Sequence, residues 1–272
     1  GTLLANYIRH QQCHRWLVFN FSEASHCPPK IEVVDHGHEF ILEQGIRHEK
    51  NCIAFLKNKG HTIVSIESEK LSLQQSLQLS LQQRCEETIR HLLALSTEIA
   101  QHADDKTYIL DQAVLIQAFL GGNGLSDDSG DGIGVPDLIR ISRKQCSTKS
   151  SPAKLKTVIW EVGDIKNSRH PQYYQKWQVA FYAFLLTQLK NKWFKSQTIA
   201  FPIEISTQGL IISKALVNSL EPSFNFFDLS PYFNSFPILI RNIENVLSDK
   251  NSGSDFQLNS HCSSCPWFSY CY

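Results

Sequence analysis

Several ordinary features are missing from this sequence. None of its 272 residues is methionine and it begins Gly-Thr, so we expect a processed or engineered fragment of a longer protein. It has no run of 18 or more apolar residues and no signal-peptide pattern at its start. We therefore expect an intracellular, cytoplasmic protein with no membrane partner. Its 26 basic and 26 acidic residues leave no net charge, so the overall charge does not indicate any class of binding partner.

Local composition is more informative than the totals. Hydrophobic residues make up 42% of the chain, which is enough for the core of one large domain or two small ones. Residues 143–195 carry eleven lysines and arginines but only two acids, Glu161 and Asp164. Such a local excess of positive charge suits a surface that follows the phosphates of a nucleic acid. A solvated face of an α/β protein explains it equally well.

Three of the eight cysteines are clustered near the end of the chain. Cys262, Cys265 and Cys271 form a C-x2-C-x5-C pattern. In an intracellular protein such clustering favours a metal over a disulfide framework. Three thiolates need a fourth ligand, and Cys13 and Cys27 are the candidates. From this chemistry alone, zinc and an iron–sulfur cluster are about equally favoured.

Hydrophobic periodicity predicts an α/β fold with a mixed sheet and helices first in the chain. The ranges expected to be helical are 1–20, 41–60, 67–102 and 171–190. The ranges expected to be strands are 61–66, 108–120, 133–143, 157–168, 198–205 and 209–213. The acidic stretch 121–132 lacks the ligand spacing and closing glutamate of a calcium loop, so we expect a hairpin tip there.

The stretch VIWEVGDIKNS, residues 158–168, combines a buried-looking strand with an acid and a base. Side chains alternate along a strand, so Asp164 and Lys166 lie on one face and Glu161 on the other. Burying this acid and base is costly unless they pair or bind something. Two interpretations follow: a structural ion pair, or an aspartate that holds a divalent cation beside a lysine that orients or activates water.

A second acid precedes this strand in the segment GVPDLI. If the strands 133–143 and 157–168 pair, Asp137 and Asp164 converge at one edge of the sheet. Two carboxylates with open positions for water suit Mg²⁺, which keeps waters and binds phosphate oxygens. The pair therefore predicts a site for a divalent cation.

The motifs GVPD and GDIK together resemble the PD-(D/E)xK nuclease signature. GIRHEK, QVAFY, QQCHR and CSSCPWFSYC resemble further motifs of the RecB-like subgroup, in the same order along the chain. This chain is also similar to CRISPR-associated RecB-like exonucleases and to bacterial RecB-like nucleases. The resemblance implies a restriction-endonuclease-like core with a mixed central sheet, a helical N-terminal cover and a C-terminal iron–sulfur lid. It implies one domain over 1–272, with a helical part (1–110), a catalytic core (107–215) and a cluster-binding segment (216–272).

The resemblance also implies roles for individual residues. It makes His48, Asp137, Asp164 and the carbonyl of Ile165 ligands of Mg²⁺ or Mn²⁺, with His36 and His38 as rivals to His48. Lys166 would position or deprotonate the attacking water, while Gln178 and Tyr182 would orient substrate and Lys166. The [4Fe–4S] ligands would be Cys13, Cys262, Cys265 and Cys271, with Cys27 as the rival to Cys13. DNA would contact Arg169, Tyr174 and Lys176, with Tyr173, Tyr174, Trp177 or Trp193 available for base stacking.

These implications lead to a functional hypothesis. We expect a metal-dependent DNA nuclease, an exonuclease on single strands or DNA ends, working with a helicase, CRISPR or repair partner. A non-catalytic iron–sulfur module that binds DNA ends is the alternative. A nuclease that cuts a specific duplex site ranks last, because no recognition element is visible.

Overall fold

The computed structural model describes most of the chain, in separate stretches. These are residues 2–21, 36–65, 81–101, 107–111, 113, 115–118, 131–144, 157–194, 199–214, 221–248 and 258–271. The helices are α1 (Thr2–Arg9), α2 (His14–Phe21), α3 (His36–Asn58), α5 (Leu81–Gln101), α6 (Tyr173–Phe194), α7 (Ser230–Phe233) and α8 (Phe236–Ser248), with 3-10 turns η2 (Cys262–Ser264) and η3 (Phe268–Tyr270). The strands are β1 (Thr62–Ser65), β2 (Tyr108–Asp111), β3 (Leu115–Ala118), β4 (Asp131–Gly134), β5 (Leu138–Arg143), β6 (Val158–Lys166), β7 (Ile203–Ile205), β8 (Gln208–Ser213) and β9 (Ser223–Asp228).

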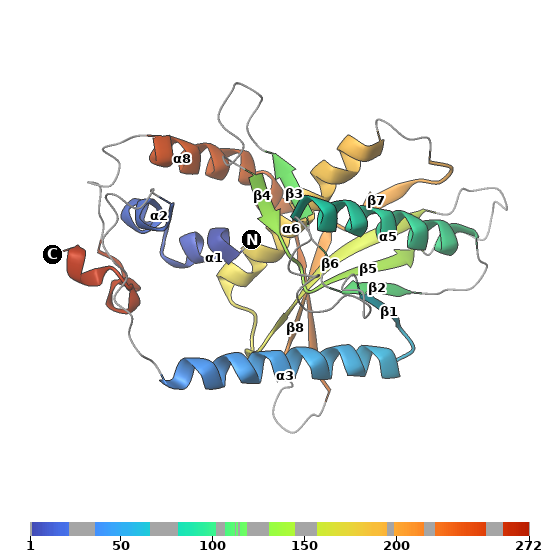
Figure 1. Ribbon diagram of the computed structural model, residues 1–272, viewed down its shortest axis with the longest axis horizontal. Helices are drawn as coiled ribbons and strands as arrows, with labels where there is room; N and C mark the ends of the chain where they lie inside the picture. The colour runs from blue at the N-terminus through green and yellow to red at the C-terminus, as the bar shows by residue number, and fades with distance from the viewer. Residues whose placement is uncertain are drawn as a thin grey trace.

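A mixed sheet forms the centre of the molecule, as the sequence predicted (Figure 1). Its strands run in the order β1-β2-β5-β6-β8-β9, and β7 pairs with the first half of β6. The pairs β2–β5, β5–β6 and β8–β9 are antiparallel, whereas β1–β2 and β6–β8 are parallel. β6 is the longest strand and lies inside the sheet, which explains its nearly continuous apolar run. β1 and β9 join this sheet although both lie outside residues 107–215.

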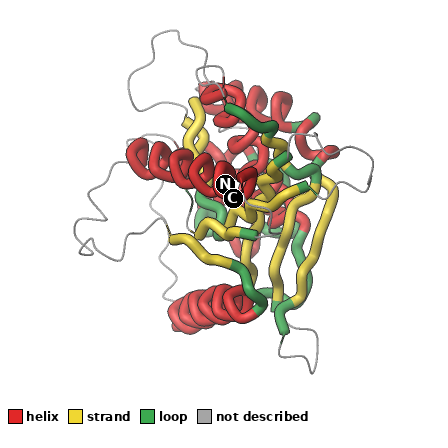
Figure 2. The backbone as a smooth tube through the Cα atoms, turned by 90° about the vertical axis from the view of Figure 1, so that its right-hand side faces the viewer, coloured by secondary structure: helices red, strands yellow, loops and turns green. Residues whose placement is uncertain are grey.

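Helices cover the two faces of the sheet (Figures 1 and 2). On one face, Cys52 and Leu56 of α3 pack on Ile109, Leu138 and other apolar side chains of the strands. On the opposite face α5 and α6 pack over the alternate side chains of the same strands, including Trp160. The alternation along β6 therefore decides which of its side chains meet α3 and which meet α6.

The N-terminal helices and the C-terminal segment lie together beside α6 (Figure 1). α1 packs against α6, and α2 against α8. The amide of Asn259 donates from Nδ2 to the carbonyl oxygen of His10 at 3.0 Å, although 249 positions separate them in the chain. The two distant parts of the chain thus form one unit on the α6 side of the sheet.

Two expected strands were wrong in extent, because each divides into two strands that belong to different sheets. Residues 108–120 contain β2 and β3, and residues 133–143 contain the end of β4 and all of β5. β3 and β4 pair with each other in a separate two-stranded sheet. The second division falls at Pro136, which has no N–H to continue a ladder. The tip expected at 121–132 lies mostly outside the described residues.

Other expectations for secondary structure were confirmed or missed for identifiable reasons. The helix predicted at 41–60 is α3, and it ends before Gly60, whose φ of +90° favours glycine. β9, α7 and α8 were missed because their sequences mix phenylalanine with proline and asparagine, which signal loops. The expected helix at 67–102 begins, within the described part, at Leu81. No helix among the described residues has both the length and the apolar character needed to cross a membrane.

Candidate functional site

The pairing of β5 with β6 brings the two predicted acids together. Leu138 is opposite Gly163 in the antiparallel register, so Asp137 and Asp164 lie at the same end of the pair. A Cβ at position 163 would lie 2.5 Å from Cδ1 of Leu138, so the glycine is what lets the leucine fill this space. The convergence that the sequence made conditional on pairing is therefore present.

Short contacts hold both carboxylates in place. The backbone N–H of Ile165 donates to Oδ2 of Asp137 at 2.6 Å. The ammonium of Lys166 lies 2.5 Å from Oδ2 of Asp164, as an ion pair. The side chain of Asp164 is only 1% exposed, and its Oδ1 has no hydrogen-bond donor among the described residues. A buried carboxylate oxygen without a donor is costly, and it is a ready ligand for a cation.

The charges and burial of this site shift the proton affinity of Asp164 and Lys166. Burial raises the pKa of Asp164 well above its usual range, and the neighbouring charge of Asp137 raises it further, against the opposing effect of Lys166. Burial lowers the pKa of Lys166, but Asp164 and Asp137 outweigh it, so the net pKa is raised. Lys166 is therefore a stable ammonium ion at neutral pH in this arrangement. This favours its positioning role over the deprotonation of water.

Two further acids face the same end of the sheet and were missed in the sequence. Burial raises the pKa of Glu49 on α3, and the charges of Asp137 and Asp111 raise it further, while Lys166 lowers it. Asp111 ends β2 and is paired in register with Leu138, the residue after Asp137. Asp111 ends the apolar run YILD, and this position at the end of a strand was the available signal. Glu49 had no signal of its own, because charged residues are common on helices.

His48 lies on α3 next to Glu49, and its ring contacts another residue of the same helix. Its Nε2 is 3.5 Å from Sγ of Cys52, one turn along the helix. Burial lowers the pKa of His48, and the charge of Lys214 lowers it further. The rival ligands His36 and His38 precede it by twelve and ten residues, which is about 15–18 Å along a helix at 1.5 Å per residue.

Gln178 and Tyr182 contact each other within α6. Nε2 of Gln178 donates to the hydroxyl oxygen of Tyr182 at 2.6 Å, and both side chains are buried. The ring of Tyr182 also packs against Gly134 of β4, where a Cβ would lie 2.7 Å from Cδ1 of Tyr182. This buried pair faces the β3–β4 hairpin as well as the sheet.

The side chains expected to bind DNA are distributed over different surfaces. Tyr174 is close enough to Lys166 to raise the pKa of that lysine. Lys176 instead lies with Nζ 5.8 Å from the ring centroid of Phe227, at the β9 edge. Arg169 is exposed in the loop after β6, and its carbonyl oxygen accepts a hydrogen bond from Ser213. Trp177 packs in the core against aromatic rings of α7 and α8, which does not favour base stacking at that position.

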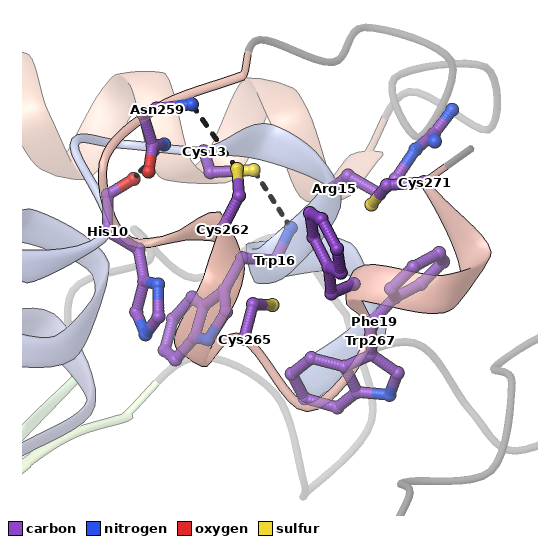
Figure 3. Close-up of a pocket in the computed structure, with 11 residues that line it drawn as sticks. His10, Cys13, Arg15, Trp16, Phe19, Asn259, Cys262, Cys265, Trp267 and Cys271 are labelled. Atoms are coloured by element: carbon purple, nitrogen blue, oxygen red, sulfur yellow. Dashed lines mark hydrogen bonds between the residues drawn. The ribbon is translucent and has the colours of Figure 1, made fainter.

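The four predicted cluster cysteines line one pocket (Figure 3). Cys13 comes from the turn before α2, and the other three come from the η2–η3 segment. Burial raises the pKa of Cys13 and Cys265, and the other cysteines of the group raise both further. The side chains of Trp16, Phe19 and Trp267 form the apolar wall of the pocket. Cys27, the rival fourth ligand, lies outside the described residues.

Backbone N–H groups point at two of these sulfur atoms. The N–H of Trp16 donates to Sγ of Cys13 at 3.5 Å, and the N–H of Asn259 donates to Sγ of Cys262 at 3.2 Å (Figure 3). Such bonds favour thiolates and tune the clusters that thiolates hold. Within the described part of the chain, no three His, Cys, Asp or Glu side chains are arranged to hold one metal ion. The four thiols are thus close to one another, and so are the carboxylates at their separate site. Among the residues described, neither group forms a complete ligand shell around a single ion.

Comparisons with known proteins place the chain in no family. No family model matches it, and no curated protein matches it. A solved structure that matches is the crystal structure of the Legionella pneumophila effector protein RavZ in complex with human LC3B. The aligned residues are 17% identical, cover 62% of this chain and 35% of the other, and superpose with a TM-score of 0.22. The chain spans about a third of that protein's length, and so low a TM-score carries no argument about fold or function.

Proposed function

We propose that this protein is a nuclease that hydrolyses phosphodiester bonds of DNA with the help of Mg²⁺ or Mn²⁺. The observation that carries the proposal is the convergence of Asp137, Asp164 and Lys166 at one end of β5 and β6. These are the residues on which the resemblance to the PD-(D/E)xK nucleases rests. The order of elements supports the same proposal: α3, three antiparallel strands β2, β5 and β6, then α6 and the parallel strand β8.

The charge balance of the site supports a divalent cation. Asp137, Asp164, Glu49 and Asp111 bring four carboxyl groups to one end of the sheet. Two cations act on them: Lys166 on Asp164 and Glu49, and Lys50 on Glu49. Buried carboxylates in excess of nearby cations either take up protons or bind a metal. The raised pKa values of Asp164 and Glu49 describe the first outcome, and a bound Mg²⁺ or Mn²⁺ would produce the second.

The residues of the site have distinct roles in this proposal. Asp137 and Asp164 would hold the cation, with the carbonyl of Ile165, and His48 would join them only after its ring leaves Cys52. The cation would supply an acidic bound water and neutralise charge on the phosphate. Lys166, as an ammonium ion, would orient that water and stabilise charge that develops on the phosphate oxygens. Gln178 and Tyr182 would support substrate from α6.

We propose that the pocket lined by four cysteines holds a [4Fe–4S] cluster. The donor set suits either zinc or iron and sulfur, and the RecB-like resemblance favours the cluster. Burial, and then repulsion by neighbouring cysteines, raise the pKa of Cys13 and Cys265, and a bound metal would relieve that repulsion. The cluster would join α2 to the C-terminal segment and so stabilise this side of the fold.

The test begins with anaerobic purification, a visible spectrum, and analysis for iron and zinc. The same sample is then incubated with end-labelled single-stranded DNA, with and without Mn²⁺. We expect a brown protein with about four irons that cuts the DNA only with the metal. A colourless protein with one zinc that still cuts would retain the nuclease and overturn the cluster.

Matched variants separate the chemistry from the fold. Lys166→Ala should abolish cleavage, whereas Lys144→Ala removes an exposed lysine paired with Glu204 at 2.7 Å and should not. Cys265→Ser should remove the colour, whereas Cys85→Ser, at a core cysteine of α5, should not. Cleavage by Lys166→Ala at the wild-type rate would remove Lys166 from the mechanism.

A second candidate function is a non-catalytic module that binds DNA ends. The observation that favours it is the closed ion pair of Asp164 with Lys166, the arrangement expected of a structural pair. Metal-independent DNA binding without cleavage under any divalent ion would establish this alternative.

A further inference from the structure

The last residue of α1 places a cation beside the candidate site. Arg9 is exposed, and its guanidinium carbon lies 5.4 Å from the centroid of the Tyr174 ring. Among the described residues, Arg9 makes no ion pair with an acid. Its guanidinium therefore makes a cation–π contact with a ring, and its N–H groups do not pair with a carboxylate of the described residues.

Tyr174 connects this cation to the chemistry. It lies in the first turn of α6, the helix that begins seven residues after β6 ends at Lys166. Arg9 stacks on this first turn of α6, and Lys166 at the end of β6 contacts Asp164, so the exposed cation lies over the start of the helix that follows the carboxylate strand.

An unusual turn follows Arg9 at the end of α1. Gln11 and Gln12 have φ values of +54° and +57°, a region that costs non-glycine residues about 1–2 kcal/mol each. The turn is held by the bond from Asn259 to the His10 carbonyl, and it leads directly to Cys13. Such strain persists where the surrounding structure holds it, and it is common where a residue must be aimed.

We propose that Arg9, stacked on Tyr174, binds a backbone phosphate of the single nucleic-acid strand whose neighbouring phosphodiester enters the carboxylate site. This inference rests on the proposed function, because it assigns the strand to that site. A guanidinium that lies over a ring keeps its N–H groups at its edge, where they form two parallel bonds to phosphate. The residue thus adds to the site a phosphate contact from a helix outside the sheet.

The negative charge of the carboxylates makes a nearby cationic contact favourable for a nucleic-acid strand. The carboxylates repel a phosphate backbone, and the charge of Lys166 is already engaged by Asp164 at 2.5 Å. An exposed cation next to them attracts the strand and offsets part of this repulsion. Arg9 is suited to this because its own partner is an uncharged ring.

The test measures binding without turnover. Anaerobically purified protein is titrated with a fluorescent single-stranded oligonucleotide in Ca²⁺ at several salt concentrations, and cleavage is measured separately with Mn²⁺. Arg9→Ala, Arg9→Lys and the control Arg241→Ala, an exposed arginine on α8, are compared with the wild type. Visible absorbance and the thermal midpoint show whether each variant keeps the cysteine centre and the fold.

We expect Arg9→Ala to weaken binding about tenfold and to reduce the slope of log K against log salt by about 0.7, the value for one phosphate on a single strand. Arg9→Lys should keep the slope and lose part of the affinity, because it keeps the charge without the fork. Arg241→Ala should match the wild type. Equal affinity and slope for Arg9→Ala and Arg241→Ala would overturn the inference.

Cleavage distinguishes this inference from the proposed function. If the wild type binds the oligonucleotide but never cuts it, and Arg9→Ala weakens binding, the phosphate contact stands and the nuclease fails. If the wild type cuts and Arg9→Ala binds normally, the nuclease stands and the contact fails. A wild type that does not bind single strands refutes the contact.

Discussion

Replacing Lys166 with methionine tests whether its partners form a buried excess of negative charge. The change keeps most of the side-chain volume and removes the ammonium that lies 2.5 Å from Asp164. Because the aspartate side chain is 1% exposed and the lysine 24%, water cannot replace the lost charge well. Removing one member of a buried pair costs about 3–5 kcal/mol, and we take about 3 kcal/mol because the lysine is partly exposed.

Lys144→Met provides the matched control on the same sheet. Its ammonium is 2.7 Å from Glu204, but both side chains are about half exposed, at 50% and 51%. Exposed pairs contribute about 0.2–1 kcal/mol, so the control should lose no more than that. Free energies of unfolding from urea denaturation in EDTA at neutral pH compare the two variants with the wild type. Equal losses in the two variants would refute the reasoning.

The loss in Lys166→Met should depend on pH and on divalent ions. The pKa of Asp164 is raised in the folded protein, and without the lysine it rises further. The folded variant therefore holds more protons than its unfolded chain, and its stability falls as pH rises above the ordinary carboxyl range. At acidic pH the two proteins should converge. Mg²⁺ at a hundred times its dissociation constant should raise the free energy of unfolding of Lys166→Met by about 2.7 kcal/mol. If Mg²⁺ leaves the stability of this variant unchanged, the cation site is refuted.

Three further predictions concern the same end of the sheet. Gly163→Ala should cost about 1–3 kcal/mol and reduce cleavage, because its Cβ would meet the Leu138 side chain at 2.5 Å; urea denaturation and a cleavage assay check this. Tyr182→Phe removes the bond from Gln178 and should cost about 1 kcal/mol, or a fall of about 2–4 °C in the calorimetric midpoint. Asp164→Asn should abolish cleavage. In EDTA it should also make stability fall less steeply as pH rises, because it removes the group with the raised pKa. Urea titrations at several pH values check this, and an unchanged slope would contradict it.

The central strand shows what a local pattern can predict. The alternation along VIWEVGDIK placed Asp164 and Lys166 on the face opposite Glu161, and the structure pairs Glu161 with Arg140 there at 2.9 Å. The acids converge because β5 and β6 pair antiparallel, a pairing that the sequence could state only as a condition. The helices α3 and α6 were predictable from their ends, because α3 stops before Gly60 and α6 begins just after Pro171.

What escaped prediction depends on contacts between distant parts of the chain. Pro136 divides two strands, but only the pairing of β3 with β4 shows that they belong to different sheets. Glu49 joins the site because α3 crosses the sheet at that point, and nothing in its local sequence distinguishes it from other surface acids. Arg9 is near Tyr174 because α1 packs on α6. Local patterns indicate which face a residue occupies, and they do not indicate which helix covers that face.

The join between the two distant parts of the chain has a consequence for biosynthesis. Cys13 is made among the first residues of this chain and its three companions among the last, so the pocket cannot assemble until translation of the segment is nearly complete. α1 and α2 emerge long before α6 and the η2–η3 segment against which they are packed. The first helices synthesised are therefore among the last to reach their final places. The strained turn at Gln11 and Gln12 would then form late, when the end of the chain arrives to hold it.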